Sequence, residues 1–409
     1  MPKIIALCVM VLISAQFALA GGRFLSPLPL PNVEVLNLES KQCNTGCLKQ
    51  FLAQGKVFSF IASVNKQNQN PAIIDTLNSL LSTFEISEIP YFSTTQKPFF
   101  KIALMFPRKS IGRYSSTTTN AIFSYLLRQQ GQFNFESFDS KTESLEDIQE
   151  TLQEIYVKGY RQVIAVVTQE GANVMNAIRP NLLVFIPSVH ISQLNTELQT
   201  PNVIFGGISY EEQIQKLSSL MPNVQAISFY DDSAIGEQMQ FYTQEANPNL
   251  IFSQSFNLKQ NPNFPREIKN LKSILYGKRI FLNTPITNSS IILSQITYND
   301  IQPSAVYSTQ INYNPSLLSI TQERDRVKMY IANSIMPIDS LLIENAKQFN
   351  TDLEYDWINY TTTFGVEYFY SKSVPNAHRY FKETIQNQQV QYEVEILQPT
   401  NTRFIPLEK

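Results

Sequence analysis

The sequence is poor in the side chains that most often carry enzyme chemistry. Its 409 residues include one tryptophan, two histidines and three cysteines. It contains no zinc-protease pattern, no nucleophile elbow of a serine hydrolase and no phosphate-binding loop of a nucleotide hydrolase. A serine–lysine pair or a pair of carboxylates is still open, because neither has a fixed spacing. We therefore expect a protein that is not an enzyme and that uses no cofactor and no metal ion.

Charged residues are also scarce, and they form no block of one sign. They make up 16% of the chain, and 32 lysines and arginines stand against 34 aspartates and glutamates, for a net charge of −2. Nucleic-acid binding depends on clustered lysine and arginine that neutralise phosphates, so we expect no nucleic-acid partner. The hydrophobic share of 43% is typical of a folded globular protein, and the chain is long enough for two or three domains.

The longest apolar run lies at the start of the chain. Lys3 precedes an almost unbroken apolar segment from Ile4 to Ala20 that ends in small residues. Residues 1–20 are therefore predicted to be a secretory signal peptide, cleaved before Gly21, and the mature protein is expected in the periplasm without a transmembrane segment. The alternative is an N-terminal membrane anchor, for which the run is short. Cys8 lies inside the run and is not placed for lipidation.

Removal of this signal leaves two cysteines, Cys43 and Cys47. An even count in an exported chain indicates a disulfide. Gly46 allows the short segment between them to turn, and so small a loop predicts local stapling more than global stability. A zinc site is disfavoured, because no histidine lies near and two thiolates do not complete a tetrahedral site.

Residues 21–98 form a distinct N-terminal region, predicted to be a small accessory α/β domain. A Pro-rich leader at residues 25–32 is expected to be extended. A polar stretch at residues 93–98 is expected to link the region to the main body. Between them the apolar pattern predicts a helix at Cys47 to Gln54, a strand at Val57 to Val64 and a helix at Pro71 to Phe84.

From Lys101 onward, short apolar strands alternate with amphipathic helices, and the same rhythm restarts after Pro222. Alternation at this spacing predicts parallel sheets with right-handed crossovers, and two such runs predict two lobes. We place the first lobe at residues 99–222 and the second at residues 223–337. Residues 338–409 are predicted to form a long crossover helix and a C-terminal hairpin.

Three places carry a resemblance to a known family. They are the strand and turn from Lys101 to Pro107, the segment from Ala226 to Gly236, and the hairpin after an aromatic-rich helix. On the basis of these places, the chain resembles the type I periplasmic binding proteins, the family of the leucine/isoleucine/valine-binding proteins, over residues 100–409. The resemblance implies two lobes of parallel sheet with flanking helices, hinge closure on a ligand, and a solute-binding role.

The turn after the third strand departs from this family. There the family has a Gly-Pro and Ser-rich turn that holds the head group of an amino acid, whereas this chain has Thr168 to Gly171. The difference argues against amino-acid transport. Outer-membrane lipoproteins that activate penicillin-binding proteins are similar in carrying the fold behind an extra N-terminal domain, although they are lipidated. That similarity implies a scaffold that does not transport a solute.

Ligands of open α/β sheets lie beyond the carboxyl ends of the strands, and this rule selects four loops, at residues 108–116, 168–170, 188–190 and 230–233. The first, at residues 108–116, carries cations, hydroxyls and a helix start that favours anions, or it is a solvated loop with a capping serine. The fourth, at residues 230–233, has an acidic pair that faces those cations or caps the next helix. The candidate ligand-binding residues are Arg108, Ser110, Arg113, Tyr114, Ser115, Thr168, Ser188, Tyr230 and Asp231.

Two functions remain open at this point. One is an envelope scaffold or regulator that acts through contacts with an envelope protein, which the altered head-group turn and the N-terminal domain favour. The other is a receptor for a small polar or anionic ligand, which the cationic loop and the acidic loop favour. We lean towards the scaffold. The sequence identifies neither the ligand, the partner nor the oligomeric state.

Overall fold

The computed structural model describes residues 43–64, 70–83, 99–112, 114–129, 131–256, 264–375 and 377–407. The chain divides into two compact units, Met1–Gln96 and Lys97–Lys409. The predicted signal peptide and the Pro-rich leader lie outside the described residues. Within the described ranges, no helix combines the length and the apolar character that a membrane span requires.

The described part of the N-terminal unit consists of helices around a small apolar core. These helices are α2 (Thr45–Ala53), α3 (Val57–Ser63) and α4 (Pro71–Thr83). The strand predicted at residues 57–64 is wrong, because this segment is helical. Phe60 and Val64 are both buried and lie four residues apart, which is the spacing of one helix face. A short apolar run fits a buried helix as well as a strand, so its periodicity alone does not decide.

Cys43 and Cys47 form a disulfide across the start of α2. Their Cα atoms are 5.4 Å apart. Asn44 is the N-cap of this helix, and its side chain accepts a hydrogen bond from the backbone N–H of Cys47 at 3.0 Å. Gly46 lies inside the first turn of α2 and does not make a separate turn between the cysteines. The bridge therefore fixes the entry of the chain into α2.

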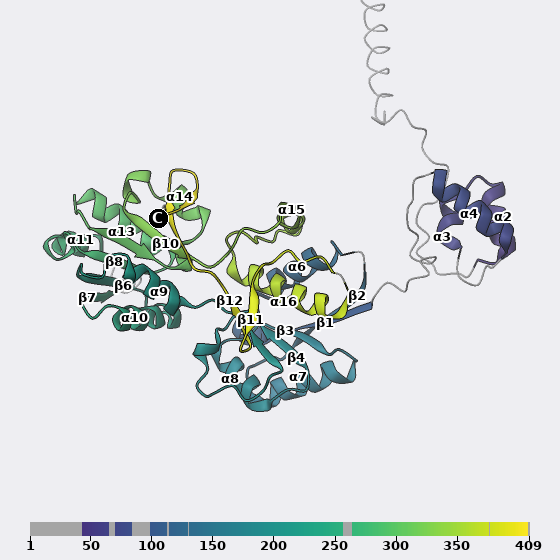
Figure 1. The fold of residues 1–409 in the computed structure, drawn as a ribbon, viewed down its shortest axis with the longest axis horizontal. Helices are drawn as coiled ribbons and strands as arrows, with labels where there is room; N and C mark the ends of the chain where they lie inside the picture. Colours follow the sequence, from purple (N-terminus) through teal and green to yellow (C-terminus); the bar gives the residue numbers. More distant parts are fainter. Residues whose placement is uncertain are drawn as a thin grey trace, which may run out of the picture. The chain divides into compact units, whose positions relative to one another are not determined.

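The first lobe of the larger unit is built on a seven-stranded sheet in the order β11-β12-β5-β4-β3-β1-β2 (Figure 1). Neighbouring strands are parallel except for the antiparallel pair β11 and β12. The strands are β1 (Phe99–Phe106), β2 (Gln132–Asp139), β3 (Gln162–Ala165), β4 (Leu183–Ile186), β5 (Val203–Phe205), β11 (Thr384–Gln386) and β12 (Gln389–Gln391). The helices are α5 (Arg108–Ile111), α6 (Tyr114–Leu126), α7 (Leu145–Val157), α8 (Gln169–Ile178), η1 (Ile191–Gln193), α15 (Ser340–Gln348) and α16 (Trp357–Ser373).

The second lobe repeats this plan with a seven-stranded sheet in the order β14-β13-β10-β9-β8-β6-β7. Its core pairs are parallel, and β13 and β14 add an antiparallel edge. The strands are β6 (Ala226–Tyr230), β7 (Leu250–Ser255), β8 (Arg279–Asn283), β9 (Ala305–Ser308), β10 (Met329–Asn333), β13 (Glu395–Pro399) and β14 (Phe404–Pro406). The helices are α9 (Tyr210–Ser219), α10 (Ala234–Ala246), α11 (Phe264–Asn270), α12 (Lys272–Leu275), α13 (Ile286–Tyr298), η2 (Gln310–Asn312), α14 (Pro315–Ile320) and η3 (Glu323–Asp325).

These two sheets with flanking helices confirm the predicted two-lobed α/β fold. The chain passes between the lobes in three places, after β5, after β10 and after β12. Helix α9 packs against α10 and β10, so the second lobe begins before Pro222. The last strands divide between the lobes, because β11 and β12 join the first sheet while β13 and β14 join the second.

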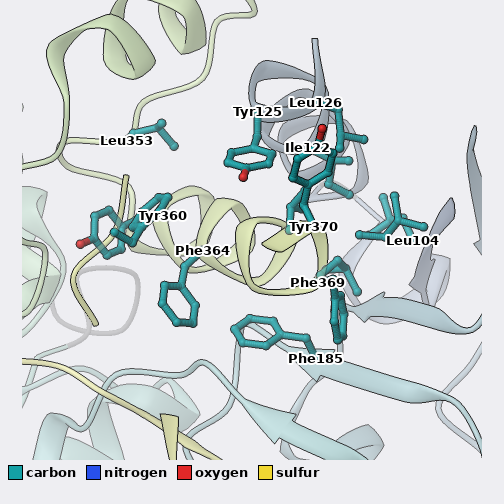
Figure 2. Close-up of a cluster of buried hydrophobic side chains, with 14 of the residues drawn as sticks. Leu104, Ile122, Tyr125, Leu126, Phe185, Leu353, Tyr360, Phe364, Phe369 and Tyr370 are labelled. Atoms are coloured by element: carbon teal, nitrogen blue, oxygen red, sulfur yellow. The ribbon is translucent and has the colours of Figure 1, made fainter. Parts of the chain in front are cut away.

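Helix α16 lies at the centre of the first lobe, beside α6 and β3 (Figure 1). Most of its length is buried on every side, which is typical of a helix in the middle of a core. Figure 2 shows Tyr370 of this helix near Tyr125, and Phe364 and Phe369 near Phe185.

The contact between α16 and β4 depends on a glycine. A Cβ atom at Gly365 would lie 2.4 Å from Cδ1 of Phe185, a separation that no real Cβ contact shows. Gly365 therefore allows the helix to approach the Phe185 ring on the sheet. This close approach holds α16 in the position from which its first residues reach the space between the lobes.

Candidate functional site

A cavity of about 850 Å³ lies between the two lobes. Its wall in the first lobe comes from the segments that follow β1, β3, β4 and β5, together with the start of α16. Its wall in the second lobe comes from the first turns of α9 and α10. The cavity therefore lies beyond the carboxyl ends of the strands, where ligands of open α/β sheets bind.

The walls of this cavity are mainly apolar. Aliphatic side chains are joined by the rings of Tyr114, Tyr210 and Trp357, and Trp357 is the one tryptophan of the sequence. Glu237 carries a negative charge, and none of the described residues that line the cavity carries a positive one. The aliphatic lining residues are Ile111, Val166, Val167, Val189, Ile208, Ala234, Ile235 and Ile358, and the remaining polar ones are Thr168, Gln169, Ser188, Gln193 and Gln238.

The donors at the start of α8 are occupied by a carboxylate of the chain itself. The backbone N–H of Thr168 donates to Oε1 of Glu143 at 2.6 Å, and the Thr168 hydroxyl donates to Oε2 at 2.6 Å. Glu143 is 6% exposed. Gly171 makes room for it, because a Cβ atom there would lie 2.6 Å from Oε1 of Glu143. A helix start that attracts anions is thus already neutralised from within.

Two other helix starts at the cavity, those of α16 and α10, are capped in a similar way. Oδ1 of Asp356 accepts the N–H groups of Ile358 and Asn359 at the start of α16, at 3.0 and 3.2 Å. Burial raises the pKa of Asp356, although these two hydrogen bonds oppose the change. At the start of α10, Ser233 accepts the N–H of Gly236 and donates to Asp231 at 2.9 Å. Each of these three helix starts therefore carries its own acidic residue.

A hydrogen bond between two glutamines joins the lobes at the cavity. Nε2 of Gln193 in η1 donates to Oε1 of Gln238 in α10 at 3.1 Å. Nε2 of Gln238 in turn donates to the hydroxyl of Tyr242 at 2.9 Å. The side-chain oxygen of Gln193 accepts the backbone N–H of His190 at 2.8 Å, so the position of this amide is fixed by its own turn.

His190 stabilises the turn that presents Gln193. Its Nδ1 accepts the backbone N–H of Ser192 at 3.2 Å and lies 2.8 Å from the Ser192 hydroxyl. Burial lowers the pKa of His190 from 6.5 to about 4, so the ring is neutral near pH 7. Only a neutral ring has a free lone pair on Nδ1 for this bond. These contacts give His190 a structural role in the turn.

Some of the predicted site residues line the cavity. They come from separate loops of the first lobe and are Tyr114, Thr168 and Ser188. The Thr168 hydroxyl is engaged by Glu143, and the Ser188 hydroxyl donates to the backbone carbonyl of Val167. Among these three residues, the ring of Tyr114 therefore offers the largest contact surface to a ligand.

The other described candidates do not line this cavity. Arg108 and Ser110 are exposed, and the backbone N–H of Arg108 donates to Oδ1 of Asp139 at 3.1 Å. Ser115 donates to the carbonyl of Gly112 at 2.6 Å, which is a local turn contact. Tyr230 ends β6 outside the cavity, and Asp231 is held by the cap of α10. Arg113 lies outside the described residues.

The sequence did not single out Trp357, Ile358 or Glu143. Trp357 and Ile358 belong to a helix that lies far along the chain from the loops of the first lobe. Glu143 acts through Thr168, and only the fold brings the two together. The signal for α16 was present, because Asp356 stands directly before an aromatic helix as an N-cap does. The part of the chain that the structure describes holds no group of three or more metal-ligating side chains.

No protein-family model and no curated protein matches the sequence. Solved structures do match it. A solute-binding protein of an ABC transporter from Rhodopseudomonas palustris BisB5, in complex with 3,4-dihydroxybenzoic acid, is 11% identical, with 76% of this chain and 96% of that one covered and a TM-score of 0.54. The leucine-binding protein LivK of Thermotoga maritima MSB8 is 9% identical, with 76% and 98% covered and a TM-score of 0.52.

LpoA of Haemophilus influenzae also matches, at 11% identity and a TM-score of 0.50. The match covers 90% of this chain and 70% of the LpoA chain. This is a larger share of this chain than the match to the Rhodopseudomonas palustris solute-binding protein covers. At these identities the likeness shows the fold alone. The chain thus has the fold of the type I periplasmic binding proteins, as the sequence predicted, and this fold serves binding proteins among its neighbours.

Proposed function

We propose that this chain is an exported, non-catalytic binding protein whose two lobes enclose an uncharged and largely apolar small ligand. The observation that carries the proposal is the cavity between the lobes. Its volume of about 850 Å³ lies within the range of ordinary ligand sites. Its apolar walls, with a few placed polar groups, are typical of small-molecule sites.

The charges around the cavity select against an anionic ligand. A bound carboxylate would face Glu237 on the wall and the acidic caps Glu143 and Asp356 behind it. None of the described lining residues offers a cation in return. Like charges placed together in a binding site weaken binding strongly. The ligand class is therefore neutral, in place of the polar or anionic ligand that the loop at residues 108–116 suggested.

Rings on the wall favour a ligand with an aromatic or branched aliphatic body. Tyr114 and Trp357 of the first lobe and Tyr210 of the second lobe provide large flat surfaces. Aromatic side chains give large contact areas and stack favourably with other rings. Hinge motion between the lobes, through the three connecting segments, would admit and release such a ligand.

A matched pair of probes tests this proposal. Titration of the full chain with 4-phenyl-1-butanol and with 4-phenylbutyrate is followed by calorimetry and by the fluorescence of Trp357. We expect the alcohol to bind at least about tenfold more tightly than the carboxylate. Equal binding of the two, or no change in Trp357 fluorescence on binding, contradicts the proposal.

A cavity-filling variant identifies the place of binding. Ala234 lies on the cavity wall in α10, whereas Ala177 is exposed in α8 and does not line the cavity. We expect Ala234→Phe to abolish binding of the alcohol and Ala177→Phe to leave it unchanged. Native mass spectrometry of the protein isolated from its own cell envelope would then identify the natural ligand as an added mass that Ala234→Phe loses.

The N-terminal unit favours a second candidate function, that of an envelope scaffold or regulator. This unit has its own buried core, formed by Leu48, Phe60 and Leu77 among others. The match to LpoA extends over 90% of this chain, more than the two lobes contain. Chemical cross-linking of the full chain in its own envelope tests the role. A single abundant partner, together with an absence of any ligand mass, would favour the scaffold over the receptor.

A further inference from the structure

A second cavity, of about 230 Å³, lies where the segment after β10 meets the α15–α16 loop and the C-terminal hairpin. It is separate from the first cavity, and the two share no lining residue. Its volume is below the range of about 300–1,000 Å³ that is usual for whole ligands. The space therefore fits one head group of a ligand, with the rest of the ligand outside.

Three aromatic rings line this cavity. The centroid of the Tyr313 ring lies 5.1 Å from that of Tyr355 and 4.9 Å from that of Phe404. The three side chains are half-buried and come from three separate segments. Grouped rings present the negative faces of their π systems, which attract organic cations.

Carboxylates stand beside these rings. Glu354 and Glu395 line the cavity, and no described lining residue carries a positive charge. Burial raises the pKa of Tyr313 well above its ordinary value, and Tyr355, Glu354, Glu395 and Asp352 raise it further. The potential at the rings is therefore negative, which makes a cation the complementary guest.

One of the two carboxylates has no partner among the residues that the structure describes. Nζ of Lys347 pairs with Oε2 of Glu354 at 2.8 Å, and this lysine side chain is 62% exposed. By contrast, the side chain of Glu395 makes no hydrogen bond and no ion pair with the residues that the structure describes. Glu395 lies opposite Asn333 on neighbouring strands, so its position at the cavity is fixed by the sheet.

We propose that the cavity lined by Tyr313, Tyr355, Phe404 and Glu395 is a binding site for an alkylated ammonium group. The rings pack against one another and form an apolar wall that contacts the methyl groups and attracts the positive charge, while Glu395 neutralises it. A free choline-like amine and a methylated lysine of a polypeptide share this chemistry. Because the site joins the C-terminal hairpin of the second lobe to the loop before α16 in the first lobe, its ligand would contact both lobes beside the connection that follows β10.

The test compares choline with its uncharged isostere 3,3-dimethyl-1-butanol on the full chain at constant ionic strength, by calorimetry and ligand-observed NMR. We expect choline to bind in the millimolar range and the alcohol about tenfold more weakly. A peptide that carries trimethyllysine forms the second arm. Tighter binding of the peptide than of choline indicates a polypeptide source, and tighter binding of choline indicates a free amine.

Two matched variants separate the site from general effects of charge. Glu395→Gln is expected to weaken choline binding at least about fivefold and to leave the alcohol unchanged. Glu393→Gln, at an exposed position two residues earlier that does not line the cavity, is expected to change neither. If Glu395→Gln fails to fold, Glu354→Gln replaces it with the same expectation. Equal binding of choline and the alcohol, or unchanged choline binding in the folded Glu395→Gln variant, overturns the proposal.

Discussion

The carboxylate of Glu143 holds both the backbone N–H and the hydroxyl of Thr168, at 2.6 Å each. This pair lies at the point where the fold would otherwise offer anion-binding donors to the cavity between the lobes. The chain thus provides its own anion at the start of α8. The stability of the first lobe depends on this relationship, and in the proposed function so does the charge of the ligand.

Removal of the Glu143 carboxylate is expected to destabilise the protein. Glu143→Ala leaves the half-buried donors of Thr168 without this partner, which costs about 1–3 kcal/mol in the free energy of unfolding. Acetate at tens of millimolar should restore part of this loss, because it can occupy the vacated position. Urea unfolding with and without acetate measures both effects. Glu150→Ala, at an exposed position of α7, is the control and should show neither effect.

Protonation of His190 is expected to destabilise the protein in mild acid. Its pKa is lowered to about 4 in the folded state from 6.5, so the unfolded state binds the proton more readily. The stabilising contribution is complete above pH 6.5 and is lost as the pH falls through 4. His190→Asn keeps an acceptor for the turn and should show a smaller decrease in the free energy of unfolding between pH 6.5 and 4. His378→Asn is the matched control, and an identical decrease in wild type and His190→Asn would contradict the prediction.

Substitution of Gly365 is expected to disturb the core of the first lobe. Gly365→Ala places a methyl group against Phe185, and overpacking of this kind costs about 1–3 kcal/mol. A smaller side chain on the other partner should relieve the clash. The decrease in the free energy of unfolding should therefore be smaller in the double variant Gly365→Ala with Phe185→Leu than the sum of the decreases in the two single variants. Urea unfolding measures these values. Strict additivity would show that the two residues do not compete for the same space.

The disulfide of the N-terminal unit is expected to stabilise that unit locally. Its cysteines are four residues apart, so the loop that it closes is short and its removal should cost less than about 3 kcal/mol. Intact mass after alkylation should show no label on Cys43 and Cys47 before reduction and two labels after it. Reduction should leave the binding of 4-phenyl-1-butanol between the lobes unchanged. Labelling without reduction would show that the cysteines are free thiols.

The two-lobed fold could be predicted because its signals are local. Apolar strands such as Ile102 to Phe106 and caps such as Ser144 repeat at a spacing that only parallel sheets with crossover helices satisfy. The segment at residues 57–64 shows where this reasoning fails. Its short apolar run carries no periodicity that separates a helix from a strand, and packing against neighbouring helices decides its form.

The lining of the cavity between the lobes could be predicted only in part, because the chemistry of a loop depends on contacts distant in sequence. Tyr114, Thr168 and Ser188 line the cavity because they follow strand ends, which a topological rule locates. The charges of Arg108 and Asp231 suggested an ionic site, but Arg108 is exposed outside the cavity and Asp231 accepts a hydrogen bond from the Ser233 hydroxyl in the cap of α10. Trp357 reaches the cavity from the far end of the chain, and only the assembled core places it there.

The position of α16 in the chain has a consequence for how the protein is made. This helix completes the core of the first lobe, yet it follows nearly the whole second lobe in the sequence. During synthesis, the hydrophobic face of the β1–β5 sheet that α16 covers stays exposed until α16 has been made. Contacts between residues so distant along the chain close slowly.

The core on the face of the sheet that α16 covers can therefore close only when nearly all of the chain has been synthesised. If residues 1–20 direct export as predicted, late closure keeps the polypeptide threadable through a narrow translocation channel. The same order of elements along the chain makes the first lobe sensitive to truncation. A nascent chain that stops before Trp357 would expose Phe185 and its neighbours, and such a fragment is a natural substrate for chaperones and proteases.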